Sequence, residues 1–137
     1  MLDWVFLKRI ALIGFLTAGV TLIVFAYEFY ANNDVTQARN AAFSALVIAE
    51  LLRSFGARSE VRTVFQVGLF SNIRLFAIVI ISLALQLLIH YWPVLERLFG
   101  TEPLSLAQCA TWVTLGAVPL SVIEFGKILR QSRMRYI

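Results

Sequence analysis

Residues 75–95 read LFAIVIISLALQLLIHYWPVL and contain no formally charged side chain. As a helix with a rise of about 1.5 Å per residue, this stretch is about 30 Å long, the thickness of a bilayer's hydrocarbon core. Tyr91 and Trp92 are typical of a membrane interface, and Pro93 is typical of a helix end. The stretch therefore predicts a transmembrane helix.

Outward from this run, the chain contains more apolar segments. Residues 10–27 and 103–123 also lack charge, and Pro119 predicts a kink in the second of these. Residues 41–55 are apolar but short, and they include Glu50 and Arg53. We expect four spans, over about 10–29, 40–56, 74–95 and 103–125.

Two connections are polar. Residues 31–40, ANNDVTQARN, predict a short loop in which Asn40 or a residue just before it caps the next helix. Residues 57–73 form a basic connection in which Val61, Phe65 and Leu69 recur at a spacing of four. This spacing predicts a short amphipathic helix on the membrane surface.

The distribution of positive charge supports four spans over three. With the N-terminus inside, the outer loops hold only Arg39 and Arg97. The inner segments hold the other ten of the twelve basic residues, which are Lys8, Arg9, Arg53, Arg58, Arg62, Arg74, Lys127, Arg130, Arg133 and Arg135. Cytoplasmic segments of membrane proteins are enriched in Lys and Arg. We therefore predict an all-α integral membrane bundle, residues 1–137 forming one transmembrane domain with both termini cytoplasmic.

Composition excludes several other classes of protein. The chain is 60% hydrophobic and 15% charged, with a mean hydropathy of +0.80, whereas soluble domains are about half apolar and about a quarter charged. The basic residues flank apolar runs, which argues against a nucleic-acid partner. Cys109 is the single cysteine, so no internal disulfide forms. No Gly-rich phosphate loop, nucleophile with a base or Cys/His cluster is present, so we expect no catalytic site and no bound cofactor in this chain alone.

Glu50 is the candidate metal ligand. It lies about ten residues into the second span, near the middle of the bilayer, where an ionisable group indicates a functional site. Carboxylates suit Ca²⁺, but a calcium site takes about six to eight oxygens. Further donors are either polar side chains of this chain or groups on helices outside it; the candidates here are Thr17, Thr21, Ser44, Ser82, Gln86 and Thr114. The alternative is that Glu50 is protonated, or pairs with Arg53, and only orders the bundle.

Other polar residues are expected to be structural. Glu124 and Lys127 form an interfacial ion pair with snorkelling side chains, and Glu28 lies at the outer interface. His90 is an interfacial histidine rather than a metal ligand, because no second His or Cys stands at ligand spacing. Small residues allow close helix approach in the first two spans: Gly14, Ala18, Gly19, Ala41, Ala42, Ser44 and Ala45.

Four stretches carry a family resemblance: AAFSALVIAELLRSFGARSE (41–60), VGLFSNIRL (67–75), YWPVLERLFGTEPLSLAQCATW (91–112) and VPLSVIEFGKILR (118–130). They contain, in order, an intramembrane acid before an S-E loop, an F-S-N entry to the next span and an aromatic-Pro exit. A short L-F-G-T loop and a last span with Pro, Glu and Lys follow. This ordered set resembles the C-terminal region of calcium-type P-type ATPases, over their seventh to tenth transmembrane helices.

The resemblance implies that different parts of the pump support the structure, transport the ion and use ATP. In such pumps these helices support a transport core in earlier helices, and ATP and Mg²⁺ act in cytoplasmic domains absent here. The eighth helix of the animal reticulum pumps supplies one carboxylate to a calcium site, and Glu50 falls on that position. Those pumps carry a neutral polar residue where Arg53 stands. A cation there either competes with bound Ca²⁺ or reaches the cytoplasmic interface by snorkelling.

The resemblance thus leads us to expect a membrane-anchoring and supporting subdomain of an ATP-driven cation pump, with Ca²⁺ as the transported ion. Its partners are the lipid bilayer and the remaining helices and cytoplasmic domains of the pump. The short first outer loop resembles bacterial members, which implies a multi-pass protein of the bacterial inner membrane. Because residues 1–4 match the preceding cytoplasmic loop, we expect a fragment or a separately encoded piece. The alternative is an independent four-helix membrane interaction or assembly protein.

Overall fold

The computed structural model describes residues 4–103 and 105–134. Within them every regular element is a helix, which confirms the all-α class. The elements are α1 (Trp4–Asn32), α2 (Val35–Gly56), α3 (Val64–Val67), the 3₁₀ turn η1 (Leu69–Ser71), α4 (Ile73–Tyr91), α5 (Pro93–Phe99), α6 (Leu106–Gly116) and α7 (Val118–Met134). Arg135 of the basic tail lies outside the described residues.

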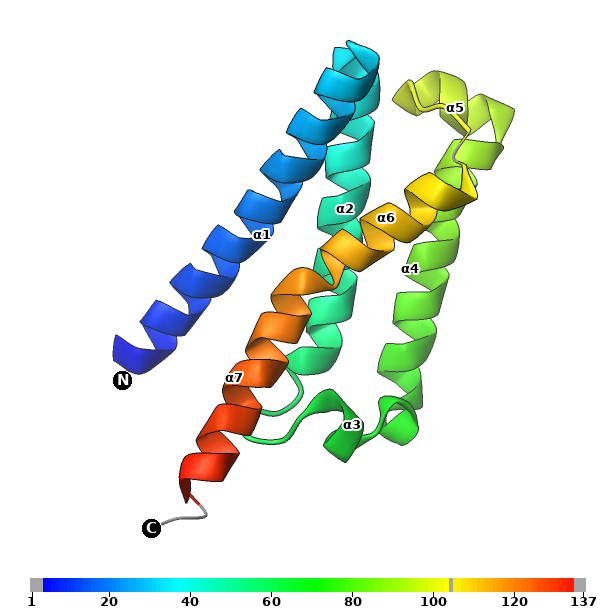
Figure 1. Ribbon diagram of the computed structural model, residues 1–137. Helices are drawn as coiled ribbons and strands as arrows, with labels where there is room; N and C mark the ends of the chain where they lie inside the picture. Colours follow the sequence, from blue (N-terminus) through cyan, green and yellow to red (C-terminus); the bar gives the residue numbers. More distant parts are fainter. Residues whose placement is uncertain (1–3, 104, 135–137) are drawn as a thin grey trace.

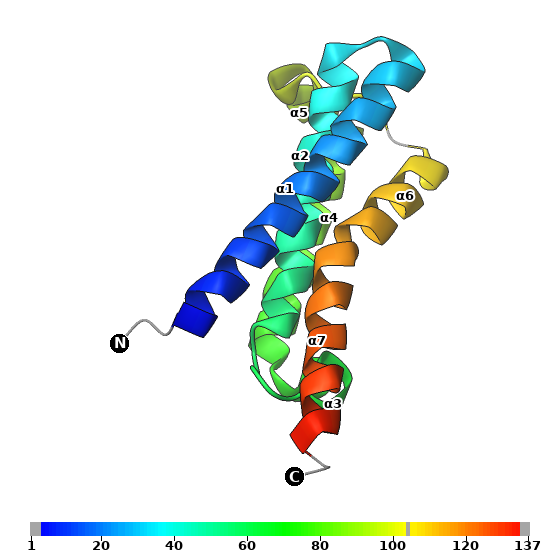
Figure 2. The same ribbon diagram turned by 60° about the vertical axis from the view of Figure 1, so that its left-hand side comes forward.

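The long helices lie side by side (Figure 1). α1, α2, α4 and the α6–α7 column form the body of the bundle. One end, here called the turn end, holds the α1–α2 turn and α5; the other, the terminal end, holds α3 and both ends of the described chain (Figures 1 and 2). The first and last described residues therefore lie at the same end of the bundle.

Three segments are long and apolar enough to cross a membrane: Phe6–Asn32, Ile73–Tyr91 and Leu106–Ser132. Most of their residues are not buried inside the bundle. Large apolar side chains are exposed along each of them, among them Phe15, Ile78 and Val113. Such a surface suits lipid rather than water.

The second expected span, α2, lies at the centre of the bundle. It packs against α1, α4, α6 and α7, and Ala38, Ala41, Ala45 and Ala49 are buried on it. Its 22 residues give about 33 Å of helix, as long as a hydrocarbon core is thick. α2 is less apolar than the three segments above because it is rich in small residues and carries charge. Neighbouring helices, rather than lipid, cover much of its surface.

Small residues allow another helix to approach α2 closely, but they do not do so on α1. A methyl group added to Gly116 of α6 would stand 2.9 Å from Ile48 Cγ2 and 3.2 Å from the Ala49 backbone nitrogen, so the α6 backbone lies directly against α2. Gly14 and Gly19 of α1 have no neighbouring atom within 4 Å of such a methyl. The expectation of close helix approach is therefore confirmed for the second expected span and wrong for Gly14 and Gly19.

The last column bends where Pro119 predicts it. α6 ends at Gly116 and α7 begins at Val118, with Ala117 between them. Figure 2 shows the change of direction. Proline lacks the N–H that would continue the helical bonding, and its ring collides with the carbonyl one turn earlier. The predicted kink is confirmed.

The first polar connection is shorter than expected. Asn33, at φ +52°, and Asp34 alone separate α1 from α2. Asp34 Oδ1 accepts hydrogen bonds from the backbone nitrogens of Thr36, at 2.7 Å, and Gln37, at 3.3 Å, and so caps α2. Asn40 lies inside the helix and donates its amide to Gly100 O at 2.6 Å. The ten-residue loop and the Asn40 cap were wrong, because the helical residues after Asp34 resemble a polar loop in composition.

The second connection does not form the expected amphipathic helix. Only α3 and η1 are helical between residues 57 and 72. Thr63 begins α3 with a capping box closed by Gln66, and Gly68, at φ +85°, ends it after four residues. Val61 and Phe65 are exposed, whereas Val64 is buried. The spacing of four was misleading because these local turn signals interrupt the helix.

Candidate functional site

Glu50 lies on the one flank of α2 that its neighbours leave open. Its side chain is 43% exposed, and exposed Phe43 lies two turns before it. Arg53 Nε donates to Glu50 Oε2 at 2.9 Å, and Arg53 Nη2 contacts the same oxygen. The Arg53 side chain is 38% exposed. This Glu50–Arg53 pair makes no hydrogen bond to any other described helix.

The other expected oxygen donors do not gather around Glu50. Ser44 and Gln86 bond to each other, and Thr21 and Thr114 donate to the backbone of their own helices. Thr17 Oγ1 is buried without a partner. Across residues 4–103 and 105–134 no group of three or more His, Cys, Asp or Glu side chains is placed to hold a metal ion. Within that range Glu50 is therefore a single carboxylate, not a formed cation site.

His90 is part of a buried network at the turn end. It is 2% exposed. Its Nδ1 donates to Glu102 O, which only accepts, at 3.0 Å. Nε2 lies 3.2 Å from Ser44 Oγ, and Ser44 Oγ accepts from Gln86 Nε2 at 2.9 Å. The ring of this histidine, expected at the interface, is thus buried in the protein, because α2 and the segment before α6 enclose it.

Glu28 is also buried, at 5% exposure. Asn32 Nδ2 donates to its Oε2 at 3.0 Å, and Trp112 Nε1 lies 3.5 Å from its Oε1. The Trp112 contact joins α1 to α6, two helices far apart in sequence. Glu28, expected at the outer interface, is thus a buried polar group that contacts α6. Sequence patterns missed this burial because it arises from tertiary contacts.

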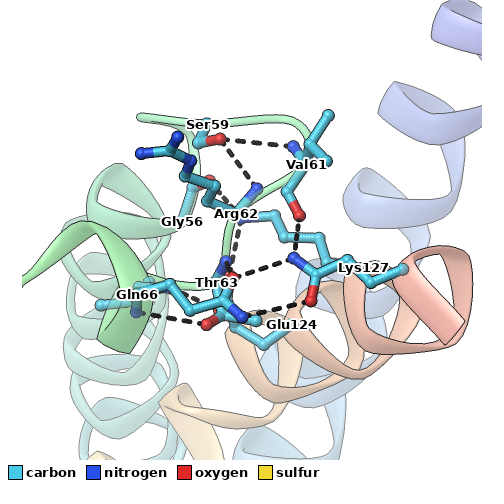
Figure 3. A network of polar contacts seen from close by, with 10 residues as sticks. Gly56, Ser59, Val61, Arg62, Thr63, Gln66, Glu124 and Lys127 are labelled. Atoms are coloured by element: carbon cyan, nitrogen blue, oxygen red, sulfur yellow. Dashed lines mark hydrogen bonds and ion pairs between the residues drawn. The ribbon is translucent and has the colours of Figure 1, made fainter. Parts of the chain in front are cut away.

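The Glu124–Lys127 pair is the centre of a second network, at the terminal end (Figure 3). Lys127 Nζ donates to Glu124 Oε1 at 2.7 Å and to Gly56 O, at the end of α2, at 2.8 Å. Glu124 Oε2 accepts from Val64 N, at the start of α3, at 2.6 Å. We call these four residues the terminal clamp. The clamp ties α7 to both ends of the segment that links α2 to α3.

The terminal clamp refines the expected interfacial ion pair. The pair itself is confirmed, but its side chains are only 4% (Lys127) and 13% (Glu124) exposed, so they do not snorkel. Gln131 extends the network by donating to Val61 O at 2.7 Å. The sequence shows the spacing of the pair but not its backbone partners in the second connection.

The sequence of this chain matches a known protein family. The model of the C-terminus of cation-transporting ATPases matches residues 1–129. This chain belongs to that family. The predicted resemblance to the C-terminal region of calcium-type P-type ATPases is therefore confirmed.

Curated relatives are bacterial and eukaryotic. A calcium-transporting ATPase of Bacillus subtilis is 29% identical over 96% of this chain, and calcium-transporting ATPase 1 of Schizosaccharomyces pombe is 30% identical over 93%. Human calcium-transporting ATPase type 2C member 1 is 32% identical over 82%. The matched region covers 14%, 14% and 12% of these relatives. The chain thus corresponds to about a seventh of the length of such an ATPase, in its C-terminal membrane region.

Proposed function

We propose that this chain anchors and supports the transport core of an ATP-driven cation pump, and that Ca²⁺ is the transported ion. The observation that supports this best is the Glu50–Arg53 pair on the open flank of α2. Charged side chains at bilayer depth are costly and face protein or a water-filled cavity rather than lipid. A further helix therefore covers this flank. The relatives are much longer than this chain, and the part of such a pump outside the matched region supplies such a helix.

The proposed topology has four spans, with α2 as the one that protein rather than lipid surrounds. Residues 1–137 then form one transmembrane domain, with the terminal end in the cytoplasm of a bacterium. Among the described residues, nine of the eleven basic residues belong to segments at that end, whereas Arg39 belongs to the part of α2 near the turn and Arg97 belongs to α5, at the turn end. This distribution supports the orientation.

Glu50 has a direct role in this proposal. It contributes one carboxylate oxygen to a cation site whose other ligands lie on the covering helices, while α1, α4, α6 and α7 hold α2 in place. The packing of Gly116 against α2 and the terminal clamp support this bracing role, because both fix α2 without using the Glu50 flank.

The first test detects the native protein in membranes. An antibody raised against residues 127–137 reports its molecular mass. A band far heavier than 15.5 kDa supports the pump. A band at 15.5 kDa that copurifies with no ATPase contradicts it and favours an independent interaction or assembly protein.

The second test concerns the carboxylate. Glu50→Gln in the full gene product keeps the shape of the side chain and removes its charge. We expect ATP-driven calcium uptake to need a higher Ca²⁺ concentration, with protein level and phosphorylation by ATP retained. Unchanged calcium dependence would exclude the ligand role and leave the anchoring role.

A further inference from the structure

Arg53 is held by the carboxylate proposed as a cation ligand. Helix side chains incline toward the N-terminus, so a residue at i+3 reaches back over residue i. The Arg53 guanidinium follows this direction and places both Nε and Nη2 on Glu50 Oε2. Two alternatives exist for Arg53: competition with a bound cation for Glu50, and snorkelling to the interface. This geometry favours competition.

A cavity beside Arg53 gives its side chain a second place to lie. The cavity has a volume of 370 Å³ at the terminal end, between α1, α2, α7 and the second connection. Arg53 lines it together with Glu60, Gly56 and Ala57. Glu60 is 3.9 Å from Arg9 in an exposed ion pair. A carboxylate and the carbonyl end of α2, which attract a cation, thus line the same cavity as Arg53. Two further cations, Arg9 and Lys127, line it as well, and they are paired with Glu60 and Glu124.

We propose that Arg53 is a specificity-determining residue, a tethered cation that occupies Glu50 until a divalent cation displaces it into the neighbouring cavity. The proposal rests on the proposed function, because Glu50 must contact the transported ion. A guanidinium joined to the same helix competes at a fixed, high local concentration, which weakens cation binding. It also leaves Glu50 neutralised when no ion is bound, which avoids an unpaired carboxylate at bilayer depth.

The test measures calcium dependence in the full gene product. Removing a charge within hydrogen-bonding distance of a carboxylate is expected to raise the apparent Ca²⁺ affinity of Arg53→Gln by about tenfold or more. Arg53→Lys keeps the positive charge but has no planar guanidinium with several donors, and it should raise the apparent Ca²⁺ affinity less. In the Glu50→Gln background, Arg53→Gln should change nothing further.

Carboxyl labelling gives a readout apart from pumping. Dicyclohexylcarbodiimide modifies protonated carboxyl groups in membranes, and mass spectrometry locates the product. We expect little labelling of Glu50 in the unchanged protein and strong labelling in Arg53→Gln, with Ca²⁺ protecting Glu50 in the variant. A purely structural Arg53 would not produce this calcium protection. Arg53→Lys, with its charge retained, serves if Arg53→Gln fails to accumulate, and we expect it to be labelled at an intermediate level.

The outcomes separate the two proposals. If Glu50→Gln weakens calcium dependence but neither Arg53 variant changes affinity or labelling, the tethered-cation proposal is overturned and the proposed function stands. If Glu50→Gln has no effect, the ligand role fails and the tethered-cation proposal fails with it. A lower calcium affinity in Arg53→Gln would also overturn the tethered-cation proposal.

Discussion

The Glu50–Arg53 pair and the terminal clamp contain the same sequence feature in opposite surroundings. Each has a glutamate followed three residues later by a cation on one helix. The Glu124–Lys127 pair is buried and bonds to the backbone of α2 and α3, whereas Glu50 and Arg53 are exposed and bond only to each other. Spacing alone therefore does not distinguish a pair that holds a fold together from one available for function.

The largest expected effect is in the terminal clamp. Lys127→Met leaves Glu124 buried without its cation and removes the bond to Gly56 O. We expect a loss of about 3 kcal/mol in the free energy of unfolding, since breaking a buried pair strands a charge. Unfolding in mixed detergent micelles measures it. The double variant with Glu124→Gln should lose less than the two single losses combined; an additive loss would contradict the coupling.

The buried network of Ser44, Gln86 and His90 contains no ion pair. It tests whether burial, rather than charge, decides how much free energy of unfolding a lost polar contact removes. Ser44→Ala removes the hydroxyl between Gln86 and His90 and leaves both without that partner. We expect a loss of about 2 kcal/mol in the same assay, the cost of buried unsatisfied groups. Ser82→Ala is the matched control on α4 and should change stability little. Equal losses in the two variants would contradict the importance of the network.

Gly116→Ala tests the side of α2 that α6 covers, in contrast to the flank of α2 that carries Glu50 and is left open. The added methyl meets Ile48 and the backbone of Ala45 and Ala49, and backbone gives way less easily than a side chain. We expect about 1–2 kcal/mol of destabilisation from overpacking. Gly14→Ala is the control, since its methyl meets nothing and the helix gains propensity. Tolerance of Gly116→Ala would mean that α6 and α2 are not closely packed.

The smallest effect is expected for Arg53→Gln in the isolated bundle. Glu50 and Arg53 bond only to each other on one helix, so losing the cation breaks no contact between helices, and the free energy of unfolding should change by no more than about 0.5 kcal/mol. Measured beside Lys127→Met, this value sharpens the contrast between the two pairs. A loss as large as that of Lys127→Met would assign Arg53 to the fold rather than to a function.

Uncharged runs were sufficient to predict the all-α class, Pro119 the kink, and the resemblance of four ordered stretches the family. Apolar content alone was a weak signal for α2, because a central helix needs small residues more than apolar ones, and the helix begins five residues before the expected start at residue 40. The burial of Glu28 and His90 was also out of reach. It depends on Trp112 and on the segment before α6, which no local pattern connects to them. Glu50 and Arg53 were identified as a pair, but the cavity beside them follows only from the packing of α1 and α7.

The two-residue turn between α1 and α2 has a consequence for biosynthesis in the proposed topology. A helix as weakly apolar as α2 partitions poorly into lipid as a single segment. With only Asn33 and Asp34 between the two helices, α2 emerges from the ribosome directly after a strongly apolar α1. The pair then enters the bilayer as a helical hairpin, in which α1 brings its partner across. Lengthening this turn would therefore reduce the amount of protein inserted into the membrane more than it would change the structure of the folded bundle.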